Sequence, residues 1–141
     1  MKIIFDSKDK TVLTTDKGEE FFTVMNAFAK ERDMSFTFSV IGGCNLVELA
    51  YYDLDVKKYL TKEFSDKNIE IVTMTGNVAW YEGDPLIHTH GIFSDRNYAC
   101  YGGHVMKLVI SATGEVVINW LTEKLTRIFD EDTCLKLLNN K

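Results

Sequence analysis

Short segments rich in β-branched and aromatic residues recur along most of this chain, separated by polar or glycine-containing breaks, which is the pattern of β-strands joined by turns. Residues 2–5 and 11–15 flank a polar turn and predict a β-hairpin. Because no helix interrupts the region after Ser35, its strands favour a largely antiparallel sheet. The strands predicted in this region are 36–41, 45–52, 59–64, 69–75, 78–81, 86–93, 104–112 and 116–121.

Two segments have a pattern that predicts a helix. Asp16 and Glu19 resemble a capping box, and after them apolar residues recur at the spacing of three and four that is typical of a helix packed on a sheet. The tail, 130–139, predicts a short final helix. The predicted fold is α+β: a single compact domain over 1–141, with a mostly antiparallel or mixed β-sheet and one main α-helix packed on it. The apolar stripe of that main helix consists of Phe21, Val24, Met25, Phe28 and Ala29.

Length and composition agree with one domain, because 141 residues with 45% apolar and 12% aromatic side chains can build their own core. After Met1 to Phe5 the chain meets Asp6 and further charges, so we expect no signal peptide, and no apolar run approaches the roughly 20 residues that cross a bilayer. We expect a soluble, cytoplasmic protein. Cys44, Cys100 and Cys134 are odd in number and widely spaced, which predicts neither a disulfide framework nor a thiolate zinc site.

The net charge of −5 opposes binding to nucleic acid, because a polyanion is repelled by an acidic surface. Acidic residues are interleaved with the basic cluster of the chain, so a solvated segment of mixed charge is favoured over a DNA-contacting patch. The basic cluster consists of Lys57, Lys58, Lys62 and Lys67.

All three histidines of the chain, His88, His90 and His104, fall close together in the sequence. In a strand, the two imidazoles of a His-x-His pair point to the same face. If Gly102 and Gly103 let the chain bend back as a hairpin, His104 comes to lie beside that pair. Three neutral imidazoles with an open fourth position are typical of a catalytic zinc site, and nickel, copper, iron and manganese remain alternatives.

Strand alternation also predicts the surroundings of these histidines. Leu86 and Ile92 share the histidine face of the strand 86–93. On the next strand, Met106, Leu108 and Ile110 are expected on the same side as His104, so that the metal lies where an apolar face begins.

The spacing also resembles the first metal motif of the cupins, from Gly83 through the His-x-His pair to Gly102. However, Asp95 stands where that motif has glutamate, and no second motif with a further histidine follows. The cupin alternative is therefore disfavoured.

Taken together, motifs spread over nearly the whole chain are similar to the plants and prokaryotes conserved (PPC) domain. One position departs from the family pattern, since Cys134 replaces the glycine that is usual there. The motifs that carry the resemblance are Gly18-Glu19, Ile41-Gly42-Gly43, Tyr51-Tyr52-Asp53, Glu70 to Asn77, His88-Thr89-His90, Gly102-Gly103-His104, Arg127 with Asp130, and Thr133-Cys134-Leu135.

This resemblance implies a compact α+β fold that forms a homotrimer, with His88, His90 and His104 as metal ligands. Plant members join the domain to AT-hooks, and prokaryotic members have been labelled DNA-binding. This chain has no Arg-Gly-Arg-Pro hook, and it therefore lacks the arginines that such a hook would insert into the minor groove. DNA binding is therefore disfavoured. The architecture also resembles acetolactate decarboxylase, a zinc lyase, at the level of the fold.

Two functions of different classes follow as hypotheses. In the first, the protein is a trimeric assembly or regulatory module whose metal site binds a small anion or holds local structure. In the second, it is a zinc-dependent lyase or hydrolase acting on a small carboxylate, with Glu70 as acid or base and Arg127 as carboxylate clamp. The ordinary alternatives are an exposed strand carboxylate for Glu70 and a surface ion pair for Arg127. The two functions differ in whether both side chains reach the pocket of the histidines.

Overall fold

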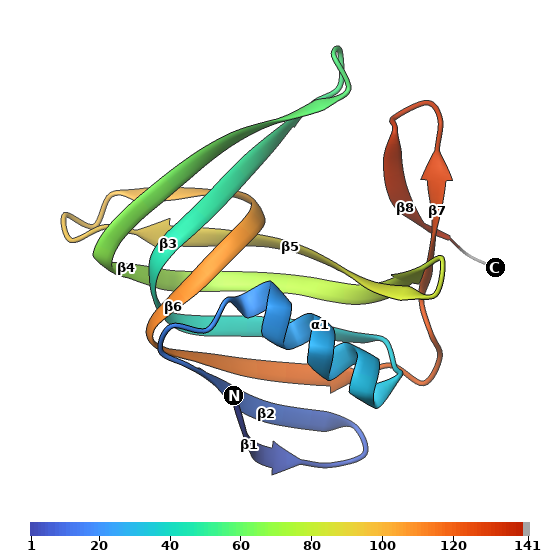
Figure 1. The fold of residues 1–141 in the computed structure, drawn as a ribbon, viewed down its shortest axis with the longest axis horizontal. Coiled ribbons are helices and arrows are strands. Elements are labelled where there is room, and N and C mark those ends of the chain that lie inside the picture. Colours follow the sequence, from blue (N-terminus) through green and yellow to red (C-terminus); the bar gives the residue numbers. More distant parts are fainter. Residues whose placement is uncertain (140–141) are drawn as a thin grey trace.

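A computed structural model describes residues 1–139 of the chain (Figure 1). Within them one eight-stranded mixed sheet carries a single α-helix, which confirms the predicted single domain with a mixed sheet and one main helix. The strand order is β1-β2-β6-β3-β4-β7-β8, and β5 pairs with both β4 and β6. The elements are β1 (Lys2–Asp6), β2 (Lys10–Asp16), α1 (Phe21–Arg32), β3 (Phe36–Asp53), β4 (Lys58–Tyr81), β5 (Asp84–Ser94), β6 (Cys100–Trp120), β7 (Thr126–Asp130) and β8 (Leu135–Asn139).

Strands β3, β4 and β6 are longer than predicted, because the glycine-containing breaks inside them are not turns. The ladder is irregular next to Gly42 of β3 and Gly114 of β6, whereas Gly76 of β4 pairs in register with Phe38. Gly42 has φ +145°, and a Cβ there would lie 2.2 Å from the Thr113 carbonyl oxygen. A glycine that permits such a close approach of two backbones has the same sequence signature as a turn glycine. The predicted pairs of short strands are therefore continuous, bent strands.

Helix α1 packs on the sheet through the predicted stripe, with Phe21, Met25, Phe28 and Ala29 buried. Its N-cap is Glu20, whose side chain accepts from two backbone N–H groups of the first turn, and not Asp16 as the capping box predicts. The reciprocal contact of that box does exist, because the Glu19 carboxylate accepts from the Asp16 N–H at 2.7 Å.

The predicted C-terminal helix over 130–139 is wrong, since β7 and β8 form an antiparallel hairpin. Asp130 Oδ2 accepts from the backbone N–H and the hydroxyl of Thr133, at 2.8 and 2.6 Å, and so closes the turn. Cys134 then takes a left-handed backbone conformation with φ +57°, which ends any helical path. The family's usual glycine at this position suits the same conformation.

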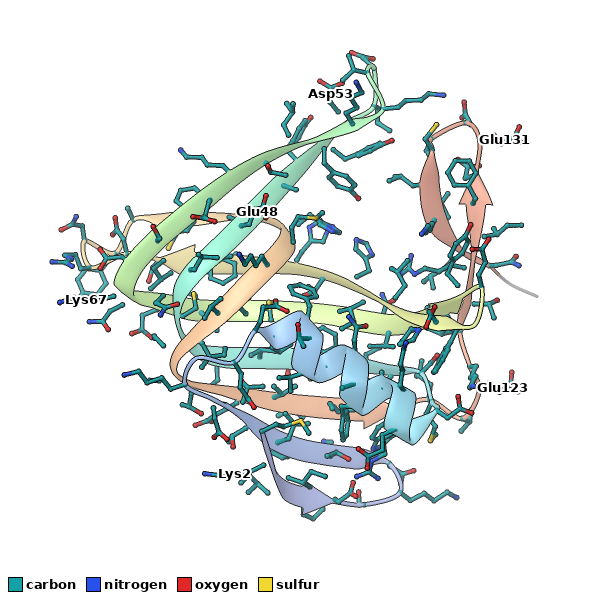
Figure 2. All side chains as sticks on the ribbon, viewed as in Figure 1. Lys2, Glu48, Asp53, Lys67, Glu123 and Glu131 are labelled. Atoms are coloured by element: carbon teal, nitrogen blue, oxygen red, sulfur yellow. The ribbon has the colours of Figure 1, made fainter. Side chains whose placement is uncertain are left out.

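Two hairpins project from the sheet, and both bear on the candidate site. The β3–β4 hairpin has Asp53 near its tip, and the β7–β8 hairpin has Glu131 near its tip (Figure 2). The Tyr52 hydroxyl donates to the Thr133 carbonyl at 2.5 Å and so joins them. In the sheet of residues 1–139, β7 pairs with β4 at one position, Trp80 with Thr126. The β7–β8 hairpin is thus held largely by side-chain contacts.

Within the described residues, no helix has the length and apolar character needed to cross a bilayer.

Candidate metal centre

The three histidines meet where β5 and β6 pair. His88 and His90 share one face of β5, and His104 of β6 lies directly opposite His90 in the ladder. One nitrogen of each ring can be chosen so that all three lie within 4.8 Å of one another, and the ring centroids are 5.1–5.2 Å apart. The structure therefore brings together the three ligands that the sequence singled out.

The route by which His104 reaches this position differs from the prediction. Gly102 and Gly103 lie inside β6, opposite Ile92 and Gly91, and not in a bend. A Cβ at Gly102 would lie 2.6 Å from the Gly91 carbonyl oxygen. Glycine is required there because β5 and β6 approach closely, and the turn between them lies earlier, before Cys100.

A bulge in β6 corrects the predicted surroundings. Met106 has no partner in β3, because Val105 pairs with Leu49 and the next pair joins Lys107 and Glu48. The extra residue reverses the alternation, so that Leu108 and Ile110 are buried in the core on the side opposite to His104. The prediction that Leu108 and Ile110 share the face of His104 is therefore wrong.

The imidazoles are suited to hold a metal ion. Within residues 1–139 their nitrogens have no hydrogen-bond partner, so their lone pairs are free. Burial, followed by His88 and His90, lowers the pKa of His104 to about 4. Burial, followed by Arg127 and His90, also lowers the pKa of His88. Zinc binds the neutral form of imidazole. Each zinc-bound imidazole nitrogen lies about 2.0–2.1 Å from the metal.

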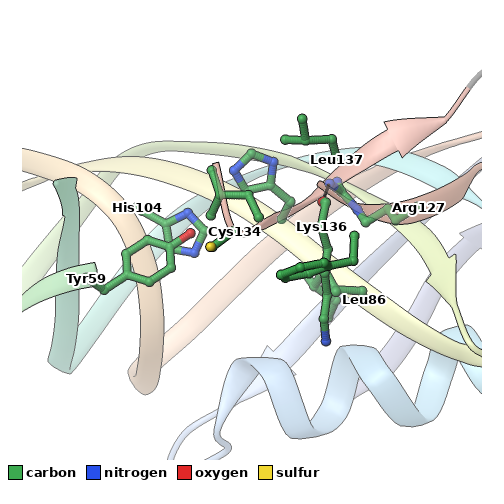
Figure 3. A pocket seen from close by; sticks show the side chains of 11 residues that line it. Tyr59, Leu86, His104, Arg127, Cys134, Lys136 and Leu137 are labelled. Carbon is green, nitrogen blue, oxygen red and sulfur yellow. Dashed lines mark hydrogen bonds between the residues drawn. The ribbon is translucent and has the colours of Figure 1, made fainter. Parts of the chain in front are cut away.

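A pocket of about 290 Å³ opens beside His88 and His104 (Figure 3). Tyr59 of the β3–β4 hairpin forms one wall, with its ring centroid 5.2 Å from that of His104. The β7–β8 hairpin and the start of β5 supply a mostly apolar wall that includes Leu86 and Leu137. The third histidine, His90, is exposed and borders a second hollow, so the cluster is approached from two sides.

Arg127 lines the same pocket, and no acidic side chain among residues 1–139 pairs with it. Its Nη1 donates to the Lys136 carbonyl and its Nη2 to Asn77 Oδ1, both at 2.8 Å, while its Nε is buried and has no acceptor. Within residues 1–139 no carboxylate lies in ion-pair distance of it. Burial lowers the pKa of its guanidinium, and Tyr59 partly opposes this effect. The surface ion pair considered as its alternative role is absent from the described residues.

Glu70 is not brought to the histidines. It pairs with Gly43 and Ser94, it is exposed, and it does not line the pocket. Thr75, the β4 partner of His90, lies five residues further along the strand, or roughly 17 Å at the usual rise. Glu70 therefore lies too far from the three histidines to act as an acid or base beside them.

Sequence reasoning missed Tyr59, Asn77 and Lys136 as neighbours of the histidines. Asn77 is the direct cross-strand partner of His88, so its role depends on the register of β4 against β5. Lys136 and Tyr59 belong to the two projecting hairpins, whose approach is a tertiary contact. The strand alternation that identified the His-x-His face predicts neither the register of β4 against β5 nor the approach of the two hairpins.

Comparisons with known proteins agree with this fold. The family model described as the Plants and Prokaryotes Conserved (PCC) domain matches residues 5–122. A "putative DNA binding protein" from Bacteroides thetaiotaomicron has a TM-score of 0.92 at 23% identity, covering 98% of this chain and 96% of that chain. A metal-containing protein from Archaeoglobus fulgidus has a TM-score of 0.85 at 28% identity, covering 99% and 100% of the two chains.

A more distant likeness joins the chain to α-acetolactate decarboxylase from Bacillus subtilis, with a TM-score of 0.58 at 19% identity. It covers 92% of this chain and 60% of the decarboxylase, and at this identity it concerns the fold alone. No curated protein matches the chain.

Proposed function

Because the chain belongs to the Plants and Prokaryotes Conserved domain family, whose model matches residues 5–122, we propose that it binds one divalent metal ion through His88, His90 and His104. The observation that carries this proposal is the convergence of three imidazoles whose nitrogens have no hydrogen-bond partner within residues 1–139, two of which, His88 and His104, have a pKa lowered by burial. A metal ion would be the binding partner of these nitrogens. The similar protein from Archaeoglobus fulgidus is named as metal-containing.

Zinc is the proposed ion, since three imidazoles and an open position suit it. An all-histidine ligand set leaves both positive charges of the ion uncompensated, so a small anion is the proposed ligand at the open position. When bound, the metal would supply Lewis-acid polarisation of that ligand. Tyr59 and the β7–β8 hairpin would shield the pocket side of the site from bulk water.

The metal proposal is tested by elemental analysis of untagged protein, because an affinity tag of histidines would itself bind metal. We expect about one equivalent of metal per chain in the natural protein and at least a tenfold loss in a variant carrying His88→Ala and His90→Ala. A variant with Asn97→Ala, in the exposed turn between β5 and β6, should retain its metal. Equal metal content in the natural protein and the double variant would contradict the proposal.

A homotrimer is the proposed assembly, on the strength of the family resemblance and of the apolar residues left exposed on one chain. Large apolar side chains that are about half exposed or more gather on the β3–β4 hairpin and on the edge strand β1. The clearest are Ile3, Ile4, Phe5, Tyr51, Leu54, Val56 and Leu60.

A zinc-dependent lyase or hydrolase acting on a small carboxylate is the second candidate. The position of Arg127 in the pocket favours it, because an unpaired guanidinium suits a carboxylate substrate. The position of Glu70 counts against it, because the proposed acid or base lies outside the pocket. The enzyme hypothesis therefore keeps its substrate anchor and loses its proton carrier.

Association with DNA is the least supported role. Similar proteins from Bacteroides thetaiotaomicron and Ralstonia eutropha carry the name "putative DNA-binding protein". The net charge of this chain is −5, and the arginine at the site, Arg127, faces a pocket too small for a duplex. A trimeric regulatory module that binds a small anion is the better reading.

A further inference from the structure

The pocket beside the histidines holds positive charge that the described residues do not neutralise. Within residues 1–139 no carboxylate lies in ion-pair distance of Arg127, although acidic side chains outnumber basic ones by 21 to 16 in the whole chain. A half-buried guanidinium without an anion is costly, because burial removes its water and no opposite charge replaces it. This arrangement indicates that an anion arrives from outside.

The guanidinium is also held in a fixed orientation. Asn77 Oδ1 and the Lys136 carbonyl each accept one of its N–H groups at 2.8 Å, which fixes the plane of the fork. Its Nε–H is buried and lacks an acceptor, and such orphan donors are rare in folded proteins. A carboxylate can accept side by side from Nε and one Nη, and this bidentate contact is the one an arginine fork provides best.

The other residues that line the pocket indicate the chemical character of the rest of the ligand. Leu86, Leu135 and Leu137 form an apolar wall next to the guanidinium. The other cation of the pocket, Lys136, has its ammonium 4.2 Å from the centre of the Tyr81 ring, so it is engaged there. One guanidinium with apolar walls suits a monocarboxylate better than a phosphate, which recruits several donors. The volume of about 290 Å³ is at the lower limit for ligand pockets, so the ligand is small.

The distance to the metal ligands is short. Asn77, which accepts from Arg127, is the direct cross-strand partner of His88, so the guanidinium lies one side chain away from a metal ligand. A molecule held by Arg127 therefore lies in the same pocket as the candidate ligands His88 and His104.

We propose that this pocket binds a short-chain oxo- or hydroxycarboxylate, whose carboxylate is held by Arg127, whose second oxygen reaches the metal, and whose hydrocarbon part packs on Leu86, Leu135 and Leu137. The contact with the metal rests on the proposed function. The contact of the carboxylate with Arg127 does not, and it is expected in the metal-free protein as well.

The experiment is calorimetric titration of zinc-loaded and metal-free protein with 2-oxoacids of increasing chain length, from pyruvate to 4-methyl-2-oxopentanoate, beside the methyl ester of the longest acid. We expect affinity to rise by up to about fourfold for each added methylene, which corresponds to about 0.8 kcal/mol of buried CH₂. The ester should bind at least tenfold more weakly than its acid, because it carries no negative charge and its alkylated oxygen is a poor acceptor for the guanidinium.

The variants separate a ligand contact from a structural role. Arg127→Lys keeps the charge but loses the fork, and it should weaken binding of the acid at least tenfold while leaving the weak binding of the ester unchanged. Arg96→Lys is the matched control, because Arg96 pairs with Asp66 in an exposed position outside the pocket. Its affinity should equal that of the natural chain.

Equal affinities for acid and ester, or an Arg127→Lys variant that binds as the natural chain does, would overturn the proposal. The comparison of acid with ester uses the natural chain, so it decides even if the variant folds poorly. Loss of metal with retention of Arg127-dependent acid binding would contradict the metal site alone. Metal binding without any acid binding would contradict the carboxylate pocket alone.

Discussion

His104 shows how one position in the fold changes the chemistry of a side chain. It is partly buried between β5 and the Tyr59 ring, and it faces two other imidazoles. Each of these surroundings disfavours its charged form, which is why its pKa falls to about 4. The same features that keep the ring neutral keep its nitrogen available to a metal.

This shift has a consequence for stability in the absence of metal. Histidine in the unfolded chain has a pKa near 6.5, and His104 in the folded chain has a pKa of about 4, so the unfolded chain binds more protons between these values. The free energy of unfolding is therefore highest above about pH 6.5 and falls as the pH drops towards 4. We expect this residue to account for a loss of roughly 1–3 kcal/mol.

Urea unfolding with chelator at pH 7 and pH 4.5 measures this loss. In a His104→Gln variant the decrease between the two pH values should be smaller than in the natural chain, because glutamine does not titrate. An Asn97→Gln variant, altered in an exposed turn, should show the full decrease. If the natural chain and His104→Gln lose the same free energy, the neutral, buried histidine is not the cause.

At the scale of elements, the sequence predicts best what local periodicity determines. The stripe of Phe21, Met25 and Phe28 placed α1 correctly, because a helix repeats its buried face within the segment itself. The pairing of His90 with His104 was also accessible, since strand alternation and a following strand suffice to predict it.

Contacts between segments far apart in the sequence explain where the predictions from the sequence were wrong. Gly102 resembles a bend in sequence but is required by the carbonyl of Gly91 on the neighbouring strand. The bulge at Met106, which reverses the side-chain alternation of β6, leaves no local signature. The C-terminal hairpin was missed because a cysteine, and not a glycine or asparagine, takes the left-handed position at its turn.

Cys134 offers a test of that hairpin. A left-handed conformation costs a residue with a Cβ roughly 1–2 kcal/mol, so Cys134→Gly should stabilise the hairpin by about 0.5–1 kcal/mol after the entropy of glycine is subtracted. Cys100→Gly is the matched control, because Cys100 is an exposed cysteine in the extended conformation of β6 and its replacement should destabilise the chain. Amide hydrogen exchange in β7 and β8 measures the first effect, and thermal unfolding the second. Changes of the same sign in the two variants would contradict the assigned turn.

At the scale of the whole molecule, the β3–β4 hairpin is hard to explain in a single chain. It projects from the sheet (Figure 1), and it exposes Tyr51 by 70%, Leu54 by 63% and Leu60 by 58%. Its inner side contacts the pocket through Tyr59, so its position affects the metal centre. An element of this kind is stabilised when a neighbouring subunit covers its apolar side.

We therefore expect light scattering coupled to size exclusion to give three times the chain mass of 16.1 kDa for the natural protein. In a closed ring of three, each subunit contacts its two neighbours through two different surfaces. We assign the β3–β4 hairpin to one of these two surfaces. Asp substitutions at both Leu54 and Leu60 would place charges in that contact and should give the mass of a single chain. Because both side chains are exposed, the fold of the chain itself should persist, with an unchanged circular dichroism spectrum.

Tyr98→Asp, at an 88% exposed residue of the β5–β6 turn, should leave the trimer intact. A natural protein with the mass of one chain would contradict the trimer, and a trimer that survives the double substitution would place the subunit contact elsewhere.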